Sequence, residues 1–111
     1  MSMQNDKSDF QTYNDGICHF HEIDEDGRPE KEVERLRYQE RTVGVRRYYE
    51  AMTAKMQIDR LIRVPFREDI TTGHYAVIAG QTYKIRQVQT IADCRPKSMD
   101  ISLQKIRQRG R

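Results

Sequence analysis

The stretch ICHFHEIDEDGRPEKEVERLRYQERT, residues 17–42, reads as two β-strands joined by a turn. Its first part, ICHFHEI, is predicted to be a strand, and the Asp-Gly pair within DEDGRPE is a strong signal for a β-hairpin. In the return part, VERLRYQERT, the side chains of Leu36, Tyr38 and the stem of Glu40 alternate with basic and polar ones. This two-residue period gives the return strand one apolar and one basic face.

The rest of the chain continues as short strands separated by turns. We predict one strand over residues 57–65, two strands around a tight turn within 75–91, and a last strand over 99–106. The segment VRRYYEAM, between the second and third strands, favours a short helix followed by a loop. The series predicts a mainly β fold: a small antiparallel β-barrel of about six short strands, with one short helix and a loop inserted between strands 2 and 3.

Two of the predicted strands indicate which side faces the core. Within residues 57–65 the apolar side chains fall mostly on one face, and Arg60 is an exception in that row. Leu61 lies on the opposite face. In the last strand, the side chains expected to point inward are Met99, Ile101 and Leu103.

At 111 residues the chain is the size of one domain with a single modest core. Hydrophobic residues make up 36% of it and Trp is absent, so contacts with neighbouring subunits would help to stabilise the fold. We divide the chain into an N-terminal arm (1–16), one barrel domain (17–106) and a basic C-terminal tail (107–111).

The sequence shows no signal for a membrane or for secretion. No apolar run reaches the roughly 18 residues that a membrane-spanning helix needs. The opening residues, MSMQNDKSDF, lack the apolar segment of a secretory signal. We therefore expect a protein made in the cytoplasm, where Cys18 and Cys94 would remain free thiols.

Charge is distributed unevenly along the chain. Residues 1–34 hold ten Asp or Glu against three Lys or Arg, whereas residues 35–111 hold seven acidic against seventeen basic residues. The net charges are therefore −7 and +10, which give the overall +3. Such polarity suits head-to-tail stacking of subunits or a basic surface near nucleic acid, and it also fits two ordinary solvated surfaces.

The best candidate for chemistry is the segment CHFH, with Cys18, His19 and His21. On a strand the two histidines point to the same face, where they could share a metal ion with His74, Cys94 or a carboxylate such as Asp24. The spacing of a known metal motif is absent, however, and half-exposed strand histidines are the simpler expectation. The sequence also lacks a nucleophile motif and a phosphate-binding glycine loop. We expect no enzyme, no catalytic residue, no metal and no cofactor.

Single-stranded nucleic-acid binding is the alternative function. Basic and aromatic residues interleave in LRYQERTVGVRRYY, and small barrels bind single strands through exposed aromatics and a basic face. Against this, Glu32, Glu34, Glu40 and Glu50 dilute the positive charge of the same region. No strand carries the pair of neighbouring aromatic residues that base stacking uses.

The segment VRRYYEAM is better explained as a contact element. In a helix, Val45, Tyr49 and Met52 recur at i, i+4 and i+7 and form one apolar stripe. A helix this short is marginal by itself and must dock on something. Tyr, Met and Arg are also enriched at protein interfaces. The stripe is expected to plug one end of the barrel, to contact a neighbouring subunit, or to do both.

The order of these features resembles the phage head–tail joining proteins, the stopper, head-completion or head-closure family of tailed phages and prophages. Three segments carry the resemblance: YNDGICHFHEIDEDG, ERTVGVRRYYEAMTAKMQIDRLIRVP and VIAGQTYKIRQVQTIADCRPKSMDISLQKI. Together they cover nearly the whole chain. The resemblance rests on the order, the lengths and the residue patterns of these segments, since none of them is a chemical motif.

The resemblance implies a virion structural protein of the head-to-tail connector. Its β-barrel subunits would form a homo-oligomeric ring, dodecameric in the particle, below the portal and its adaptor. The ring would close the channel for packaged double-stranded DNA and give the tail, or a tail-completion protein, a docking surface. A neighbouring role as adaptor or tail-completion protein is also compatible, and the particle could belong to an infectious phage or a defective prophage.

The resemblance also implies that the insert between strands 2 and 3, residues 42–57, reaches towards neighbouring subunits and the channel. Two basic residues beyond the insert, Lys84 and Arg86, could flank the passing DNA without binding it tightly. The residues expected to make the intersubunit or channel-facing contacts are Arg46, Arg47, Tyr48, Tyr49, Met52, Ala54, Lys55, Met56 and Gln57.

Overall fold

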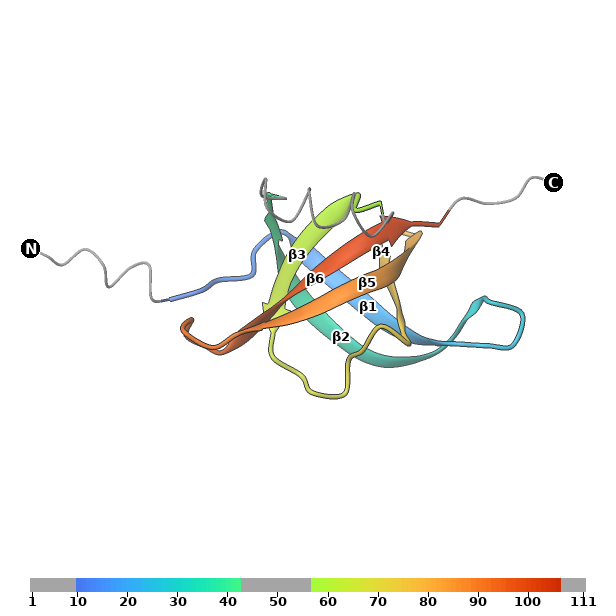
Figure 1. The fold of residues 1–111 in the computed structure, drawn as a ribbon, viewed down its shortest axis with the longest axis horizontal. Coiled ribbons are helices and arrows are strands. Elements are labelled where there is room, and N and C mark those ends of the chain that lie inside the picture. Colours follow the sequence, from blue (N-terminus) through green and yellow to red (C-terminus); the bar gives the residue numbers. More distant parts are fainter. Residues whose placement is uncertain (1–9, 43–56, 107–111) are drawn as a thin grey trace, which may run out of the picture.

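The computed structural model describes residues 10–42 and 57–106, which form one antiparallel β-sheet closed into a barrel (Figure 1). The prediction of a mainly β barrel with six strands is confirmed. Within the two described ranges there is no helix, and the segment for which a helix was predicted lies outside them. The strands are β1 (Gly16–Ile23), β2 (Pro29–Arg41), β3 (Arg60–Pro65), β4 (Tyr75–Ile78), β5 (Gln81–Ile91) and β6 (Ser98–Lys105).

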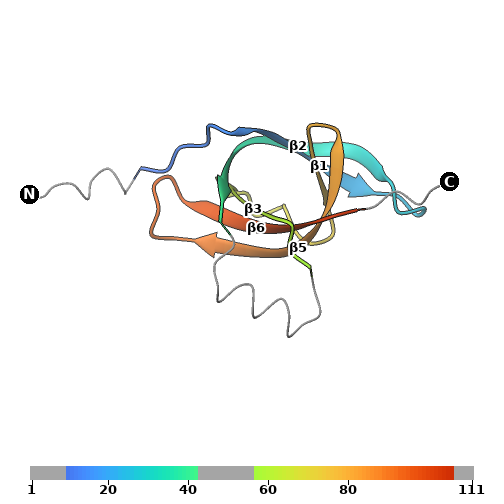
Figure 2. The ribbon, with the colours of Figure 1, turned by 90° about the horizontal axis from the view of Figure 1, so that it is seen from above.

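The strands follow the spatial order β1-β2-β3-β6-β5-β4, and β4 pairs back with β1 to close the sheet (Figure 2). Only three residue pairs make this closure, with His19 opposite Val77, Phe20 opposite Ala76 and His21 opposite Tyr75. Closure gives each strand two neighbours, which removes most of the open edges that short strands would otherwise expose.

The β1–β2 hairpin has the apolar face that its alternation predicted. Cys18 pairs with Leu36, and both side chains are buried. Strand β2 begins at Pro29, four residues before the predicted start, so the hairpin extends beyond the barrel. Its register shifts between Phe20 and His21 and again between His21 and Ile23. Bulges of this kind bend and twist a hairpin.

The turn between β1 and β2 is organised by Asp24. Its carboxylate oxygen Oδ1 accepts hydrogen bonds from the backbone N–H groups of Asp26 and Arg28, at 2.9 and 2.8 Å. Gly27 follows with a φ of 79°, a conformation that glycine adopts without steric cost. The Asp-Gly signal in the sequence therefore marked the turn correctly.

The β4–β5 connection is a two-residue turn made by Ala79 and Gly80. Their φ angles are 50° and 81°, and positive φ at both central residues is the mark of a type I′ hairpin turn. Ala79 is the one non-glycine residue with positive φ among the described residues. An L-residue in this region carries a steric cost that glycine avoids.

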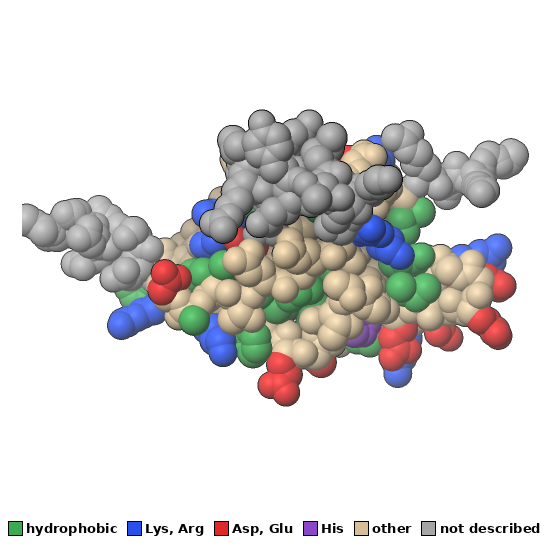
Figure 3. All heavy atoms as spheres, in the orientation of Figure 1, with side chains coloured by type: hydrophobic (Ala, Val, Ile, Leu, Met, Phe, Trp, Pro, Cys, Tyr) green, Lys and Arg blue, Asp and Glu red, His purple; other side chains and the backbone are tan. Residues whose placement is uncertain are grey.

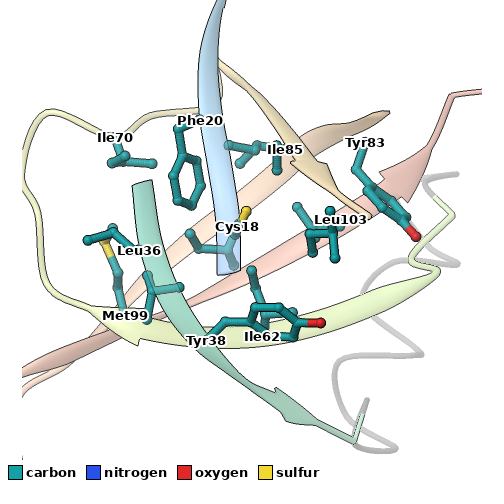
Figure 4. Packing of buried hydrophobic residues seen from close by; sticks show 14 residues of the cluster. Cys18, Phe20, Leu36, Tyr38, Ile62, Ile70, Tyr83, Ile85, Met99 and Leu103 are labelled. Carbon is teal, nitrogen blue, oxygen red and sulfur yellow. The ribbon is translucent and has the colours of Figure 1, made fainter. Parts of the chain in front are cut away.

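The core fills the barrel interior with side chains from all six strands (Figure 4). Fourteen buried residues form one cluster, and Phe20, Ile62, Ile85, Met99, Ile101 and Leu103 are its largest fully buried members. Burying a side chain of this type contributes about 1.5–3 kcal/mol. The inward direction predicted for Met99, Ile101 and Leu103 is confirmed.

Strand β6 is buried on both faces. The polar residues that alternate with its core side chains, Ser98, Asp100 and Ser102, are also buried. On β3, Leu61 is buried although it lies outside the core cluster, on the face opposite to Ile62. Among the described residues there is no helix long and apolar enough to cross a membrane.

Candidate functional site

The predicted contact residues fall mostly outside the described part of the chain. Arg46, Arg47, Tyr48 and Tyr49 lie there, as do Met52, Ala54, Lys55 and Met56. Gln57 is described and exposed just before β3, and its side-chain amide donates to Asp59 Oδ1 at 2.7 Å. The structure instead shows how the two barrel strands that flank this insert are held.

Arg60 joins those two strands. It is the first residue of β3, and its guanidinium donates to both carboxylate oxygens of Glu40, near the end of β2. The distances are 2.6 Å from Nη2 to Oε1 and 3.3 Å from Nε to Oε2. A bidentate arginine–carboxylate pair is among the stronger and more directional polar contacts in proteins.

The same guanidinium lies against two core tyrosines. It donates from Nη1 to the Tyr83 hydroxyl at 3.1 Å and from Nη2 to the Tyr38 hydroxyl at 3.2 Å. Its central carbon lies 5.4 Å from the Tyr83 ring centroid and 5.6 Å from that of Tyr38, within the range of cation–π attraction. In Figure 4 both hydroxyls point towards the same end of the barrel. We call Arg60, Glu40, Tyr38 and Tyr83 the Arg60 cluster.

The Arg60 cluster explains the exception in the apolar row of β3. Arg60 shares the inward face with Ile62, but at the strand's first position that face opens at the barrel end. The arginine stem can therefore cover the core while its head bonds Glu40 and the tyrosine hydroxyls. The hydrogen bond to Glu40 is the main reason that the pKa of Arg60 is raised above its ordinary value.

Asp59 ties the start of β3 to β6. Its backbone N–H donates to the Leu103 carbonyl at 2.7 Å, and its Oδ2 accepts from the backbone N–H of Lys105 at 2.7 Å. On the other side of the insert, Asp15 Oδ2 accepts from the backbone N–H of Glu40 at 2.7 Å. Both strand ends that flank the insert are thus fixed by hydrogen bonds.

The described part of the N-terminal arm packs across the outside of the barrel. The Tyr13 hydroxyl and Ser98 Oγ are 2.7 Å apart. The side-chain oxygen of Gln11 accepts from Arg63 Nη1 at 3.1 Å. Arg63 also donates from Nε to Asp100 Oδ1 at 2.6 Å, and this hydrogen bond is the main reason that its pKa is raised.

The two basic residues expected near DNA differ in exposure. Lys84 is exposed on β5, opposite Gln104 of β6. Arg86 is only partly exposed, and it stands at a register shift where β5 has one residue more than β6. Its Nε is buried without a hydrogen-bond partner in the described part of the structure. Lys84 is therefore the better placed of the two for phosphate contact.

The residues of the CHFH segment have separate structural roles. Cys18 is in the core, where burial raises its pKa to about 12. His19 Nδ1 donates to Glu32 Oε1 at 2.7 Å, and this contact is the largest cause of the lowered pKa of Glu32. His21 Nδ1 lies 2.9 Å from the Glu30 carbonyl oxygen. Among the described residues, no three His, Cys, Asp or Glu side chains are grouped as metal ligands.

The other residues considered as ligands are also engaged elsewhere. His74 Nδ1 accepts from the backbone N–H of Thr71 at 3.2 Å. Cys94 Sγ lies 3.4 Å from Ser98 Oγ and 3.9 Å from Arg63 Nη1. Asp24 organises the first turn. These contacts place the possible ligands in different parts of the molecule.

Aromatic side chains on the described surface are few. Tyr38, Tyr75 and Tyr83 are buried, and the Tyr75 hydroxyl donates to the Gly27 carbonyl at 2.9 Å. Phe10 is the large aromatic residue that stands out as exposed in residues 10–42 and 57–106. The described barrel surface therefore lacks a row of exposed aromatics for stacking bases.

Sequence reasoning missed Arg60 as the centre of a cluster. The signal was an arginine within the apolar row of the strand predicted over residues 57–65. The structure starts this strand at Arg60, and the identity of its partners depends on pairing between distant segments.

Comparison of the chain with models of known protein families and with curated proteins finds no match.

Proposed function

We propose that this chain is a structural protein of a tailed-phage particle, which forms a ring of identical subunits in the head-to-tail connector. The ring lies below the portal and its adaptor, closes the DNA channel, and offers a docking surface to the tail. The observation that carries the proposal is the way the barrel holds the two strands that flank its long β2–β3 connection.

This connection, residues 42–59, is the longest between consecutive strands of the described barrel. The Arg60 cluster joins β2 to β3 directly, through two hydrogen bonds between Arg60 and Glu40. A segment that contacts neighbours or narrows a channel has to start from fixed points, because movement at its base would be transmitted to its tip. The Arg60 cluster supplies such a base.

The surface of the barrel fits a structural role better than a single-strand binder. Binding of single strands relies on exposed aromatics, and the described barrel tyrosines are buried in the core or near it. Lys84 gives the surface an exposed cation, while Glu32 and Glu34 hold the nearby arginines Arg35 and Arg67 in ion pairs. Weak contact with passing DNA suits a channel, since tight binding would obstruct ejection.

The test is to mix the protein with DNA-filled heads that carry a portal, and to examine the portal vertex by cryo-electron microscopy. The proposal expects a ring of density at that vertex and DNA that stays inside the heads during incubation. If the protein does not bind heads but retards single-stranded oligonucleotides in a gel, the proposal is refuted and the alternative function is supported.

A variant of the insert provides the second arm of the test. Tyr49→Ala combined with Met52→Ala is expected to reduce ring formation on heads more than it lowers the melting temperature of the free protein. Arg37→Ala, at an exposed position of β2, is the matched surface control and should leave both unchanged. Equal losses of ring formation and stability in the double variant would mean that these two residues serve only the fold.

A further inference from the structure

Phe10 forms an exposed aromatic knob at one end of the molecule. Its side chain is 71% exposed, the largest value among the exposed large hydrophobics of the described residues. Its backbone is held, since Phe10 forms a β-bridge with Arg95 and the next N–H, of Gln11, donates to the Arg95 carbonyl at 2.7 Å. An apolar side chain on a fixed backbone is pre-organised for binding.

A cleft of about 640 Å³ lies at the opposite end of the barrel. Figure 1 shows the two ends: the start of the described chain is beside the β5–β6 turn on the left, and the β1–β2 hairpin and the end of β6 are on the right. The cleft is bounded by the tips of the β1–β2 and β4–β5 turns and by the end of β6. Its lining residues are Gly27, Arg28, Pro29, Tyr75, Gly80, Gln81, Thr82, Lys105 and Ile106.

The chemistry of the cleft suits an aromatic side chain. Tyr75, Pro29 and Ile106 supply apolar surface, and hydrophobic side chains are visible at this end in Figure 3. Arg28 and Lys105 supply cations, which are attracted to the face of an aromatic ring. The cleft volume is within the range of small-ligand sites and exceeds what one phenyl ring needs.

Gly80 lines the cleft at the β4–β5 turn. A Cβ atom at Gly80 would meet no heavy atom within 4 Å, so the space beside this turn is empty. Phe10 and the cleft are therefore two complementary surfaces at opposite ends of the described barrel. A contact between two different surfaces of identical subunits is heterologous, and its repetition produces a ring if the rotation closes and a filament if it does not.

We propose that Phe10 of one subunit inserts into the cleft of a second copy of this chain, between Tyr75, Thr82 and Ile106, in a head-to-tail contact. The closing of such contacts into a ring at the portal rests on the proposed function. The contact itself is a property of the chain and operates in solution as well.

Sedimentation of the free protein over a wide concentration range tests the contact. Wild-type protein is expected to associate, and Phe10→Ala to weaken the association at least about tenfold, the loss typical of a central aromatic anchor. Thr82→Trp, which fills the cleft, should do the same. Ile17→Ala is the matched control, because among the described residues Ile17 is the other exposed large hydrophobic, and it belongs neither to the Phe10–Arg95 bridge nor to the lining of the cleft.

A mixture of the Phe10→Ala and Thr82→Trp proteins tests whether the contact is head-to-tail. Phe10→Ala retains an intact cleft and Thr82→Trp retains an intact knob, so an equimolar mixture should form heterodimers and stop there. A mixture that stays monomeric while the wild type associates would overturn the proposal, as would a wild type that remains monomeric throughout. Circular dichroism of each variant verifies that it is folded, and Phe10→Leu gives a milder change of the same surface.

The outcome of this test is separable from that of the phage experiment. Association in solution that depends on Phe10, without binding to heads, leaves the head-to-tail contact standing and removes the proposed function. Rings on heads that form equally well with Phe10→Ala leave the function standing and remove the contact.

Discussion

The guanidinium of Arg63 and the carboxylate of Asp100 form an ion pair on the outside of the barrel, with 2.6 Å between Nε and Oδ1 and 3.0 Å between Nη2 and Oδ2. The two side chains are 13% and 8% exposed, so solvent screens the pair only weakly. The pair joins β3 to β6, and Gln11 of the N-terminal arm bonds to the same guanidinium. It therefore couples the arm to the barrel.

Replacing Asp100 is expected to destabilise the protein strongly. Asp100→Ala leaves the Arg63 charge in a poorly solvated position without its partner, which costs about 3 kcal/mol of unfolding free energy. Urea titration followed by circular dichroism measures the change. Asp93→Ala, at an exposed position of the nearby turn, is the control and should change stability by less than about 0.5 kcal/mol. A similar small effect for Asp100→Ala would mean that the pair contributes little.

From the contacts of the Arg60 cluster we predict that lysine at position 60 only partly restores the stability that arginine gives. Arg60→Ala should lower the unfolding free energy by about 2 kcal/mol, because it removes the bonds to Glu40 and the stacking on Tyr38 and Tyr83. Arg60→Lys should recover less than half of that loss, since an ammonium group lacks the planar fork. Chemical denaturation of both variants provides the measurement. Full recovery by lysine would show that charge alone matters at this position.

The β4–β5 turn offers a stabilising substitution. Ala79 has a φ of 50°, and Asn tolerates this conformation better than other non-glycine residues and is favoured before Gly in type I′ turns. Ala79→Asn is expected to raise the unfolding free energy by about 0.5–1 kcal/mol. Ala92→Asn is the control, because Ala92 is an exposed turn residue without positive φ. A melting temperature that falls for Ala79→Asn would contradict the turn assignment.

Cys18 predicts a specific loss of stability at alkaline pH. Burial raises its pKa from 9.0 to about 12, so the folded state keeps the neutral thiol while the unfolded chain ionises above pH 9. The neutral thiol's contribution is thus intact below pH 9 and lost as the pH rises towards 12, at about 1.4 kcal/mol per pH unit. The stability difference between wild type and Cys18→Ala should shrink by about 1 kcal/mol between pH 9 and pH 10, where the unfolded thiol is still titrating, and by more over the next pH unit. A difference that is independent of pH would mean that the folded thiol titrates normally.

Much of the fold could be predicted because local pattern and local structure coincide. The alternation around Leu36 and Tyr38 marked β2, and Asp-Gly marked the first turn. The start of β2 was placed too late because Pro29, Glu30 and Lys31 carry no apolar pattern, although the hairpin extends through them. Pro29 pairs with Ile23 of β1 beyond a register shift, and such backbone pairing leaves no periodic trace in the side chains.

The candidate site was less predictable from sequence. The pattern of charges and apolar residues identified an insert between strands 2 and 3. It did not explain why an arginine, Arg60, interrupts the apolar face of the strand that follows. The partners of Arg60 come from β2 and β5, at least twenty residues away on either side. Such a cluster depends on which strands are neighbours, and several strand orders are compatible with the same local patterns.

The amino-acid sequence by itself determined the strands, their inward faces and the tight turns, because these depend on side-chain periodicity and on local backbone preferences. The tertiary structure decided the closure of β4 onto β1, the position of Arg60 at the barrel end, and the placement of Phe10 and the cleft at opposite ends. Each of these is a relationship between residues far apart in the chain, and its free energy comes from packing and pairing that exist only once the sheet has closed.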